Sequence, residues 1–288
     1  MTVTVAPAAP VRPVHGVPGD RASRTVGDVD LTVLPQRTTD ELDAMRAAGR
    51  VVAQTLAAVR AAVVPGVKLR DLDDLAQTCI REAGATSSFL GYKPAWAPTA
   101  YNGALCLSPN EVVVHGRPSG RRLHEGDVLS VDCGAIVDGW NGDAAITLLV
   151  GQATSEDDAR LVRATEEALA AGIAASVPGA TLLDVATAID AVARRYGFAH
   201  LPDHGGHGIG RSMHEPPFVP NKPMAGLDRV RLQAGSTLAI EPMLLAGEER
   251  YKHKKDGWAV VTADGRRAAH VEHTVAVTDE GPVVLTAA

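Results

Sequence analysis

The sequence has few cysteines and no long apolar run, and both scarcities exclude whole classes of protein. Its 288 residues include only three cysteines, Cys79, Cys106 and Cys133, without CxxC spacing. We therefore expect neither a disulfide framework nor a thiolate zinc site. No apolar run approaches the roughly 18 residues that a membrane span needs, and the N-terminus lacks the basic start and apolar core of a signal peptide. These features predict a cytoplasmic protein with reduced thiols.

The chain also lacks a strong charge of either sign. Its formal net charge of −6 gives no reason to expect DNA or an anionic membrane as a partner. Hydrophobic residues make up 45% of the chain and charged residues 22%, which supports a sizeable core and excludes a largely disordered chain. One short basic run, residues 250–255, is more typical of a solvated loop than of a nucleic-acid patch.

Residues 1–36 form the first distinct segment, which is rich in proline, valine and glycine and has no helical period. Pro7, Pro10 and Pro13 have the PxxP spacing that an SH3-like groove could bind. Such spacings are common in proline-rich tails, so we expect a flexible extension. The remainder, residues 37–288, is expected to form the folded part.

Two helices should open the folded part. Thr38 and Glu41 have capping-box spacing at the start of an apolar stripe that Pro65-Gly66 ends. A second helix is expected over Leu69–Glu82. The Val-Pro-Gly signal at 64–66 recurs 113 positions later at 177–179, and the helical patterns around it recur with it. Ser155 and Asp158 repeat the capping signature before the second copy.

The stretch from Glu125 to Val150 reads as a β-hairpin. Its two apolar runs, 128–136 and 144–150, meet at Asp138-Gly139, and an Asp-Gly pair favours a type I′ turn. If Val137 pairs with Trp140, then Asp132 and Asp143 share one face as diagonal neighbours. Two carboxylates inside an apolar hairpin repel each other, so we expect either a shared proton or a cation between them.

The strands repeat as the helices do. Residues 125–132 resemble residues 234–241, which places Glu241 opposite Asp132, and a later strand over His270–Val277 carries Glu272. The chain therefore reads as a helix pair followed by antiparallel sheet, twice, with two carboxylates from each half. We predict one α+β domain with internal pseudo-twofold symmetry, because a site made from both halves requires them to pack together.

Four carboxylates and an imidazole suggest a metal centre. The glycine-rich segment 204–214 separates the two carboxylate pairs and offers histidines, and its glycines would let backbone approach a ligand or another segment closely. Oxygen-rich coordination with one nitrogen suits Mn, Fe, Co or Zn. Two ions that share Asp143 and Glu272 are chemically reasonable. His204, three residues before His207, could contact a metal-binding side chain without binding the metal itself. Cys106 and Cys133 are more typical of small buried apolar residues.

The chain is identified as a member of the pita-bread metallopeptidases and resembles type I methionine aminopeptidases. The resemblance covers about residues 38–280, and its matching segments are NEVVVHG at 110–116, VDCGAIVDGWNGD at 131–143, GHGIGRSMHEPP at 206–217, LAIEPM at 238–243, DGWAVVTADG at 256–265 and VEHTVAVT at 271–278. It implies a pita-bread fold and two divalent metal ions per chain. The metal ligands it implies are Asp132, Asp143, His207, Glu241 and Glu272.

The resemblance also implies a substrate site. His115 and His214 would contact the substrate, and Glu241 is our candidate for moving a proton to the leaving amine. The methionine pocket it implies is lined by Phe89, Tyr92, Cys106, Met213 and Trp258. Residues 92–105 are longer than the usual pattern, so the aromatic residue that completes the pocket is Trp96 or Tyr101.

The resemblance predicts removal of N-terminal methionine from peptides and nascent chains, with a preference for small second residues, by a monomer that works at the ribosome. An Xaa-Pro aminopeptidase or dipeptidase of the same fold is the alternative, but such enzymes carry an extra N-terminal domain that residues 1–36 are too few to form. A non-catalytic pita-bread binding protein is a further alternative, and it should have lost ligands that this chain retains.

Overall fold

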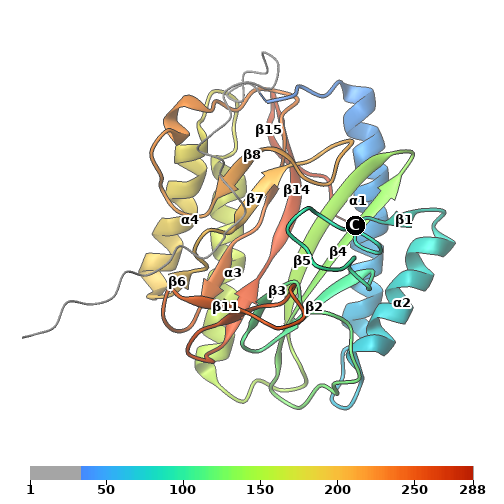
Figure 1. Cartoon of the computed structure of the whole chain (residues 1–288). Helices are drawn as coiled ribbons and strands as arrows, with labels where there is room; N and C mark the ends of the chain where they lie inside the picture. Colours follow the sequence, from blue (N-terminus) through green and yellow to red (C-terminus); the bar gives the residue numbers. More distant parts are fainter. Residues whose placement is uncertain (1–33, 288) are drawn as a thin grey trace, which may run out of the picture.

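A computed structural model describes residues 34–287 (Figure 1). The expected extension, residues 1–36, lies almost wholly outside the described residues. Of its last three residues, Leu34 is buried and packs in the core of the second half. Within residues 34–287, no helix has the length and apolar composition needed to cross a bilayer.

Four helices occur as two pairs, as the sequence predicts. Their bounds are α1 (Thr39–Ala62), α2 (Leu69–Glu82), α3 (Glu156–Ala175) and α4 (Leu182–Tyr196). The capping box of Thr38 and Glu41 is confirmed at the start of α1. In Figure 1 the first pair lies at the right of the sheet and the second pair at the left.

The predicted cap of α3 is wrong in detail. Ser155 does cap this helix, but its hydroxyl accepts from the Asp157 N–H, and Asp158 lies instead 3.6 Å from the Arg267 guanidinium. The capping box of the second half is at α4, between Thr181 and Asp184. The helix pairs therefore repeat although their caps do not, because either first-turn arrangement satisfies the free backbone N–H groups.

A nine-stranded sheet forms the centre of the molecule, with the order β1-β4-β5-β14-β9-β7-β8; β2 also pairs with β4, and β15 with β14. Its strands are β1 (Thr86–Ser87), β2 (Leu105–Pro109), β4 (Val128–Val137), β5 (Trp140–Leu149), β7 (Gly205–Gly208), β8 (Glu215–Pro220), β9 (Thr237–Ile240), β14 (Glu272–Thr278) and β15 (Gly281–Val284). Two small sheets and a 3-10 turn complete the fold, with β3 (Val112–Val114), β6 (Ala199–His200), η1 (Leu227–Arg229), β10 (Met243–Leu245), β11 (Tyr251–His253), β12 (Val260–Thr262) and β13 (Ala268–His270).

The predicted hairpin is confirmed in its register. Val137 pairs with Trp140, and Asp138 and Gly139 have φ angles of 51° and 77°, as a type I′ turn requires. One strand prediction is wrong, because the strand expected over 270–277 breaks at Val271, so that His270 ends β13 and Glu272 begins β14. The basic run 250–255, expected to be a solvated loop, is mostly exposed, but residues 251–253 form the strand β11, which pairs with β12.

The two halves each contribute a core and meet within the main sheet. In the first half, α1 and α2 pack on β4 and its neighbours through residues such as Leu56 and Val131. In the second half, Ile189 of α4 packs with β9 and β14. The seam between the halves is the pairing of β5 with β14, where Glu272 faces Ala145. The α+β class and the repeated helix-pair-and-sheet arrangement are thus as predicted.

Gly142 of β5 lies directly against the backbone of helix α1 at Gly49. A Cβ on Gly142 would lie 2.8 Å from the Gly49 nitrogen and 2.9 Å from its Cα. Real Cβ atoms do not approach so closely, so any larger residue at 142 must push the strand away from the helix. The next residue along β5 is Asp143, so this contact sets the depth of that carboxylate in the sheet.

We predict that Gly142→Ala lowers the free energy of unfolding by about 1–3 kcal/mol, because the added methyl overpacks a backbone contact. Urea denaturation measures this effect. Gly120→Ala is the control, because its Cβ would meet only the mobile end of the Arg70 side chain. Equal stability of the two variants would contradict the backbone contact.

Candidate metal centre

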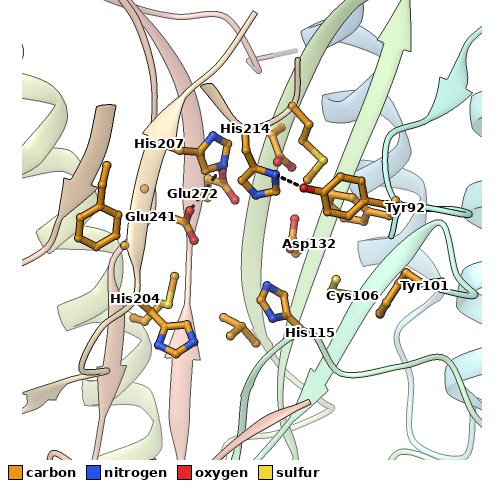
Figure 2. A pocket seen from close by; sticks show the side chains of 18 of the residues that line it. Tyr92, Tyr101, Cys106, His115, Asp132, His204, His207, His214, Glu241 and Glu272 are labelled. Atoms are coloured by element: carbon orange, nitrogen blue, oxygen red, sulfur yellow. Dashed lines mark hydrogen bonds and ion pairs between the residues drawn. The ribbon is translucent and has the colours of Figure 1, made fainter. Parts of the chain in front are cut away.

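Five adjacent strands of the main sheet each bring one side chain to a single cluster. In the order β4, β5, β14, β9 and β7, these residues are Asp132, Asp143, Glu272, Glu241 and His207, with Glu241 directly after the end of β9. All five line one cavity of about 350 Å³ (Figure 2). The structure thus assembles all five side chains that the sequence analysis proposed as ligands.

The strand register places Asp132, Asp143 and Glu272 on the same face of the sheet. Ala145 of β5 pairs with Asp132 on one side and with Glu272 on the other. Asp143, two residues earlier on β5, shares their face of the sheet. The Thr274 hydroxyl accepts from the Asp143 N–H at 3.0 Å and donates to the Asp143 carbonyl at 2.8 Å. This side chain holds β5 to β14 at the point where the two halves meet.

The glycines around His207 allow strand β7 to lie close to its neighbours. A Cβ on Gly206 would collide with the Ala239 carbonyl, and one on Gly208 with the Pro216 carbonyl. Close backbone approach is therefore confirmed, and the approaching partner is the protein's own sheet. The His207 Nδ1–H donates to the Gly208 carbonyl at 2.9 Å. This bond fixes the tautomer in which Nε2 keeps its lone pair for a cation.

The cluster is electrostatically costly by itself. Burial raises the pKa of Asp132 to about 7; the neighbouring His270 opposes this rise and the Glu241 charge adds to it. Burial and the Asp132 charge raise the pKa of Asp143 well above its usual range, and burial does the same for the pKa values of Glu241 and Glu272. Loss of water is the first cause of all four shifts, and repulsion between neighbouring carboxylates adds to it at Asp132, Asp143 and Glu272.

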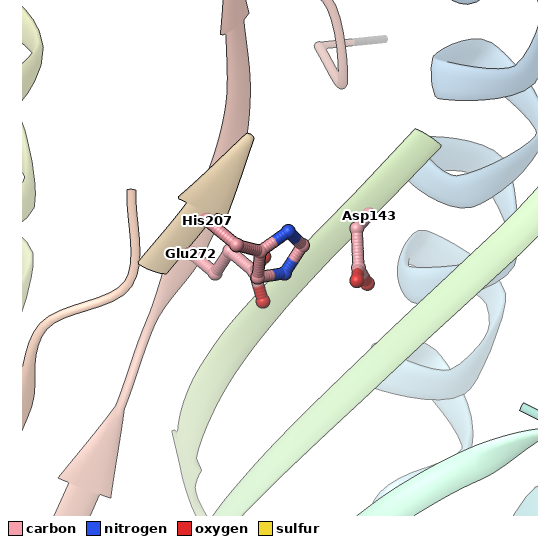
Figure 3. A group of neighbouring side chains, drawn as sticks. All are labelled: Asp143, His207 and Glu272. Carbon is pink, nitrogen blue, oxygen red and sulfur yellow. The ribbon is translucent and has the colours of Figure 1, made fainter. Parts of the chain in front are cut away.

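The side chains fit divalent cations. Asp143, His207 and Glu272 offer three ligand atoms within 4.8 Å of one another (Figure 3), and Glu241, His270 and Glu272 offer another such group. Within residues 34–287, one buried oxygen of each of Asp132, Asp143 and Glu272 has no hydrogen-bond partner. Oxygens without partners at the meeting point of several carboxylates have the chemistry of a hard-cation site. Of the two explanations for the hairpin carboxylates, a cation is the one these atoms favour.

Two further histidines stand on the cavity wall. The Nδ1 atom of His214 is hydrogen-bonded to the Tyr92 hydroxyl at 3.0 Å (Figure 2). The ring centroids of His214 and His207 are 4.3 Å apart. His115 lies across the cavity, and burial lowers its pKa to about 3. Burial also lowers the pKa of His214. Both imidazoles are therefore neutral near pH 7, and each has one N–H to donate.

The proposed pocket residues all line the same cavity, and these are Phe89, Tyr92, Cys106, Met213 and Trp258. Both candidates from the long 92–105 segment are there as well. Tyr101 is 3% exposed and packs edge-on against Trp258, so it belongs to the closed part of the wall. Trp96 is 44% exposed and stacks on His115, which places it at the mouth. The Trp258 indole N–H donates to the Thr99 carbonyl and holds this segment against the pocket.

The sequence analysis left one residue of the cluster unassigned. His270 is buried, and its Nε2 lies 3.3 Å from Glu241 and 3.8 Å from Glu272. Its position two residues before Glu272 was a signal only within the strand predicted over 270–277, where alternate residues share a face, and the chain breaks that strand at Val271. His204 lines the cavity too, but its Nδ1–H donates to the Pro202 carbonyl at 2.7 Å.

Comparisons with known proteins agree with this chemistry. The model of metallopeptidase family M24 matches residues 43–279. The chain is 54% identical to methionine aminopeptidase 1 of Mycobacterium tuberculosis, over 88% of this chain and 95% of that protein. It is 45% identical to methionine aminopeptidase of Aquifex aeolicus, over 85% of this chain and 96% of that one.

Solved structures give the same picture. The crystal structure of methionine aminopeptidase from Thermotoga maritima matches with a TM-score of 0.84 and 40% identity, over 89% of this chain and all of that one. Prolidase from Pyrococcus furiosus matches with a TM-score of 0.69 and 21% identity, over 90% of this chain and 66% of that one. The prolidase likeness shows a shared fold alone.

We predict that the metal-free protein loses stability as pH rises from about 4 towards about 7. The pKa of Asp132 is about 7 in the folded state and about 3.9 in an unfolded chain, so between these values the folded state holds more protons. Rising pH then favours unfolding, by up to about 1.4 kcal/mol per pH unit for one such group. Urea midpoints at pH 5 and pH 7, after dialysis against a chelator, measure the slope.

Saturating Mn²⁺ should remove this pH dependence, because a bound cation stabilises the ionised carboxylates. Asp132→Asn, without added metal, should reduce the slope as well. The same slope with and without Mn²⁺ would show that the carboxylate cluster does not bind the ion.

Proposed function

Because the chain belongs to metallopeptidase family M24, we propose that it is a metal-dependent aminopeptidase that removes the N-terminal methionine from peptides and nascent proteins. One observation carries this function. A buried cluster of carboxylates and an imidazole shares a single cavity with a wall of apolar, sulfur-containing and aromatic side chains. Such a cavity combines hydrolytic chemistry with a site for a long, thioether-bearing side chain.

Two divalent ions per chain, drawn from Co, Mn, Fe and Zn, complete the proposed centre. Asp132, Asp143, His207, Glu241 and Glu272 would hold them, with Asp143 and Glu272 shared. Glu272 belongs to both groups of convergent ligand atoms, which supports its shared role. When bound, such ions supply Lewis acidity, which polarises a carbonyl and makes water a usable nucleophile near neutral pH.

The chain's own residues would position the substrate and move its proton. The neutral imidazoles of His115 and His214 each offer an N–H to the scissile carbonyl, and one such donor is typically worth about 2.7–4 kcal/mol in the transition state. Tyr92 holds His214 through Nδ1, which leaves Nε2 directed elsewhere in the cavity. Glu241 belongs to one of the two groups of convergent ligand atoms, beside Glu272, and is the carboxyl we assign to proton transfer to the leaving amine.

The methionine side chain would lie against Phe89, Tyr101, Cys106 and Trp258, which form one buried cluster with Tyr92 and Met213 packed on it. The exposed Trp96 and Phe218 flank the cavity where the rest of the peptide must leave it. We propose that these two side chains limit the space for the second residue of the peptide, and that this limit underlies a preference for small second residues.

The Xaa-Pro alternative has less support. The chain covers 95% of the methionine aminopeptidase of M. tuberculosis but 66% of the prolidase, and its identity to the latter is 21%. A non-catalytic binding protein is also disfavoured, because all five proposed ligands remain together in the cavity. We further propose one catalytic domain over residues 37–288 behind the 1–36 extension, acting as a monomer on nascent chains at the ribosome in the cytoplasm.

We expect metal-depleted protein to cleave Met-Ala-Ser only after a divalent ion is restored. Mn, Fe, Co and Zn are added back one at a time, and released methionine is measured. An Xaa-Pro peptide is offered in parallel and should remain intact. Cleavage of the Xaa-Pro peptide alone would overturn the assignment.

We expect Glu241→Gln to fold normally and to lose activity on Met-Ala-Ser by about 10²–10⁴-fold, the range for removal of a general acid–base group. The measurements are the initial rate and the urea midpoint. Glu248→Gln serves as the matched control, because Glu248 is half-exposed and paired with Arg250 away from the cavity. Full activity of the Glu241 variant would rule out proton transfer by this carboxyl.

A further inference from the structure

His270 is a buried imidazole with no assigned role. It is 2% exposed, and its Nε2 has no well-aligned hydrogen-bond partner among the described residues. A buried polar atom without a partner is costly, so its surroundings must account for it. Two carboxylate oxygens lie close to it, the Oε2 of Glu241 at 3.3 Å and the Oε2 of Glu272 at 3.8 Å.

The backbone of His270 is firmly held. Its N–H donates to the hydroxyl oxygens of Ser130 and Thr147, each at 3.1 Å, and the Thr147 hydroxyl donates to its carbonyl at 2.6 Å. On the other side, Met243 of β10 pairs with it. The imidazole therefore extends from a fixed point towards the carboxylates.

The two oxygens of Glu241 face different imidazoles. Oε1 lies 3.7 Å from the Nε2 of His207, and Oε2 lies 3.3 Å from the Nε2 of His270. The terminal torsion of a glutamate is broad, so its side chain does not choose between these orientations unaided. The His207 nitrogen carries a free lone pair, because its ring donates from Nδ1 to the Gly208 carbonyl. Oε1 and His207 therefore face the same cation position.

We propose that His270 is a positioning residue whose Nε2–H holds the Oε2 of Glu241, so that Oε1 remains directed at the cation that His207 also binds. This inference rests on the metal-dependent function proposed above and adds a residue to it. The imidazole presents one donor at a fixed place, and the carboxylate loses the freedom to turn. Outer partners of this kind commonly contribute 10–100-fold to metal affinity.

The test is a calorimetric titration of metal-free protein with Mn²⁺ and Co²⁺. For each metal, we expect His270→Leu to bind the first, more tightly held ion about 10–100-fold more weakly than the unchanged protein does. His270→Gln should restore most of this affinity, because its amide offers an N–H at a similar reach. With metal saturating, the Leu variant should show a lower kcat for Met-Ala-Ser and a KM within about twofold, since the pocket wall is untouched.

His273→Leu is the matched control. His273 is also a largely buried histidine beside Glu272, but its Nδ1 is hydrogen-bonded to the Thr286 hydroxyl at 2.9 Å, on the other side of the strand. Its loss should leave metal affinity unchanged. Urea midpoints of all variants separate a change in ion binding from a loss of folding.

Two results would overturn the proposal. Unchanged metal affinity in His270→Leu would show that the imidazole does not position Glu241. Equal loss in the Leu and Gln variants, with a changed visible spectrum of the Co²⁺ protein, would show that His270 is itself a ligand. If the unchanged protein binds metal but does not cleave Met-Ala-Ser, the proposed function fails, whereas the titration still decides the role of His270.

Discussion

Mutual repulsion among buried carboxylates is the constraint on which this structure depends. Asp132, Asp143, Glu241 and Glu272 lie together in the centre of an apolar sheet, and burial raises the pKa of each. Nothing in a hydrophobic core favours such a group by itself. The sheet holds the carboxylates in place, and the divalent metal that family M24 implies is the charge that would compensate them.

The internal repeat explains how one chain builds this arrangement. Each half provides a helix pair that packs on its own strands, and the halves meet where β5 pairs with β14. Two carboxylates from the first half, Asp132 and Asp143, thereby face Glu241 and Glu272 from the second. The Thr274 hydroxyl, bonded to both backbone groups of Asp143, holds the halves in register at this seam.

Much of this fold could be predicted from the sequence, because turn residues and apolar spacing determine local structure over short stretches of chain. The Asp-Gly turn gave the hairpin register, and the helix bounds of α2 followed from apolar spacing. The gathering of the four carboxylates in one place was predictable, because the internal repeat and the resemblance pointed to the same residues. The break at Val271 and the approach of His270 to Glu241 were not, because both result from packing between segments far apart in the chain. The position of Trp96 depends likewise on contacts with His115 and Trp258.

The separation of the carboxylate cluster from the pocket wall has an evolutionary consequence. The cluster stands on adjoining strands of one sheet, where a single-residue insertion would turn every following side chain to the opposite face. The segment 92–105, which carries Trp96 and Tyr101, lies outside those strands, and its Trp96 side chain is 44% exposed at the mouth of the cavity. Substitutions and length changes there can alter which peptides fit while the hydrolytic centre is inherited unchanged. Selectivity and reactivity in this molecule can therefore diverge independently.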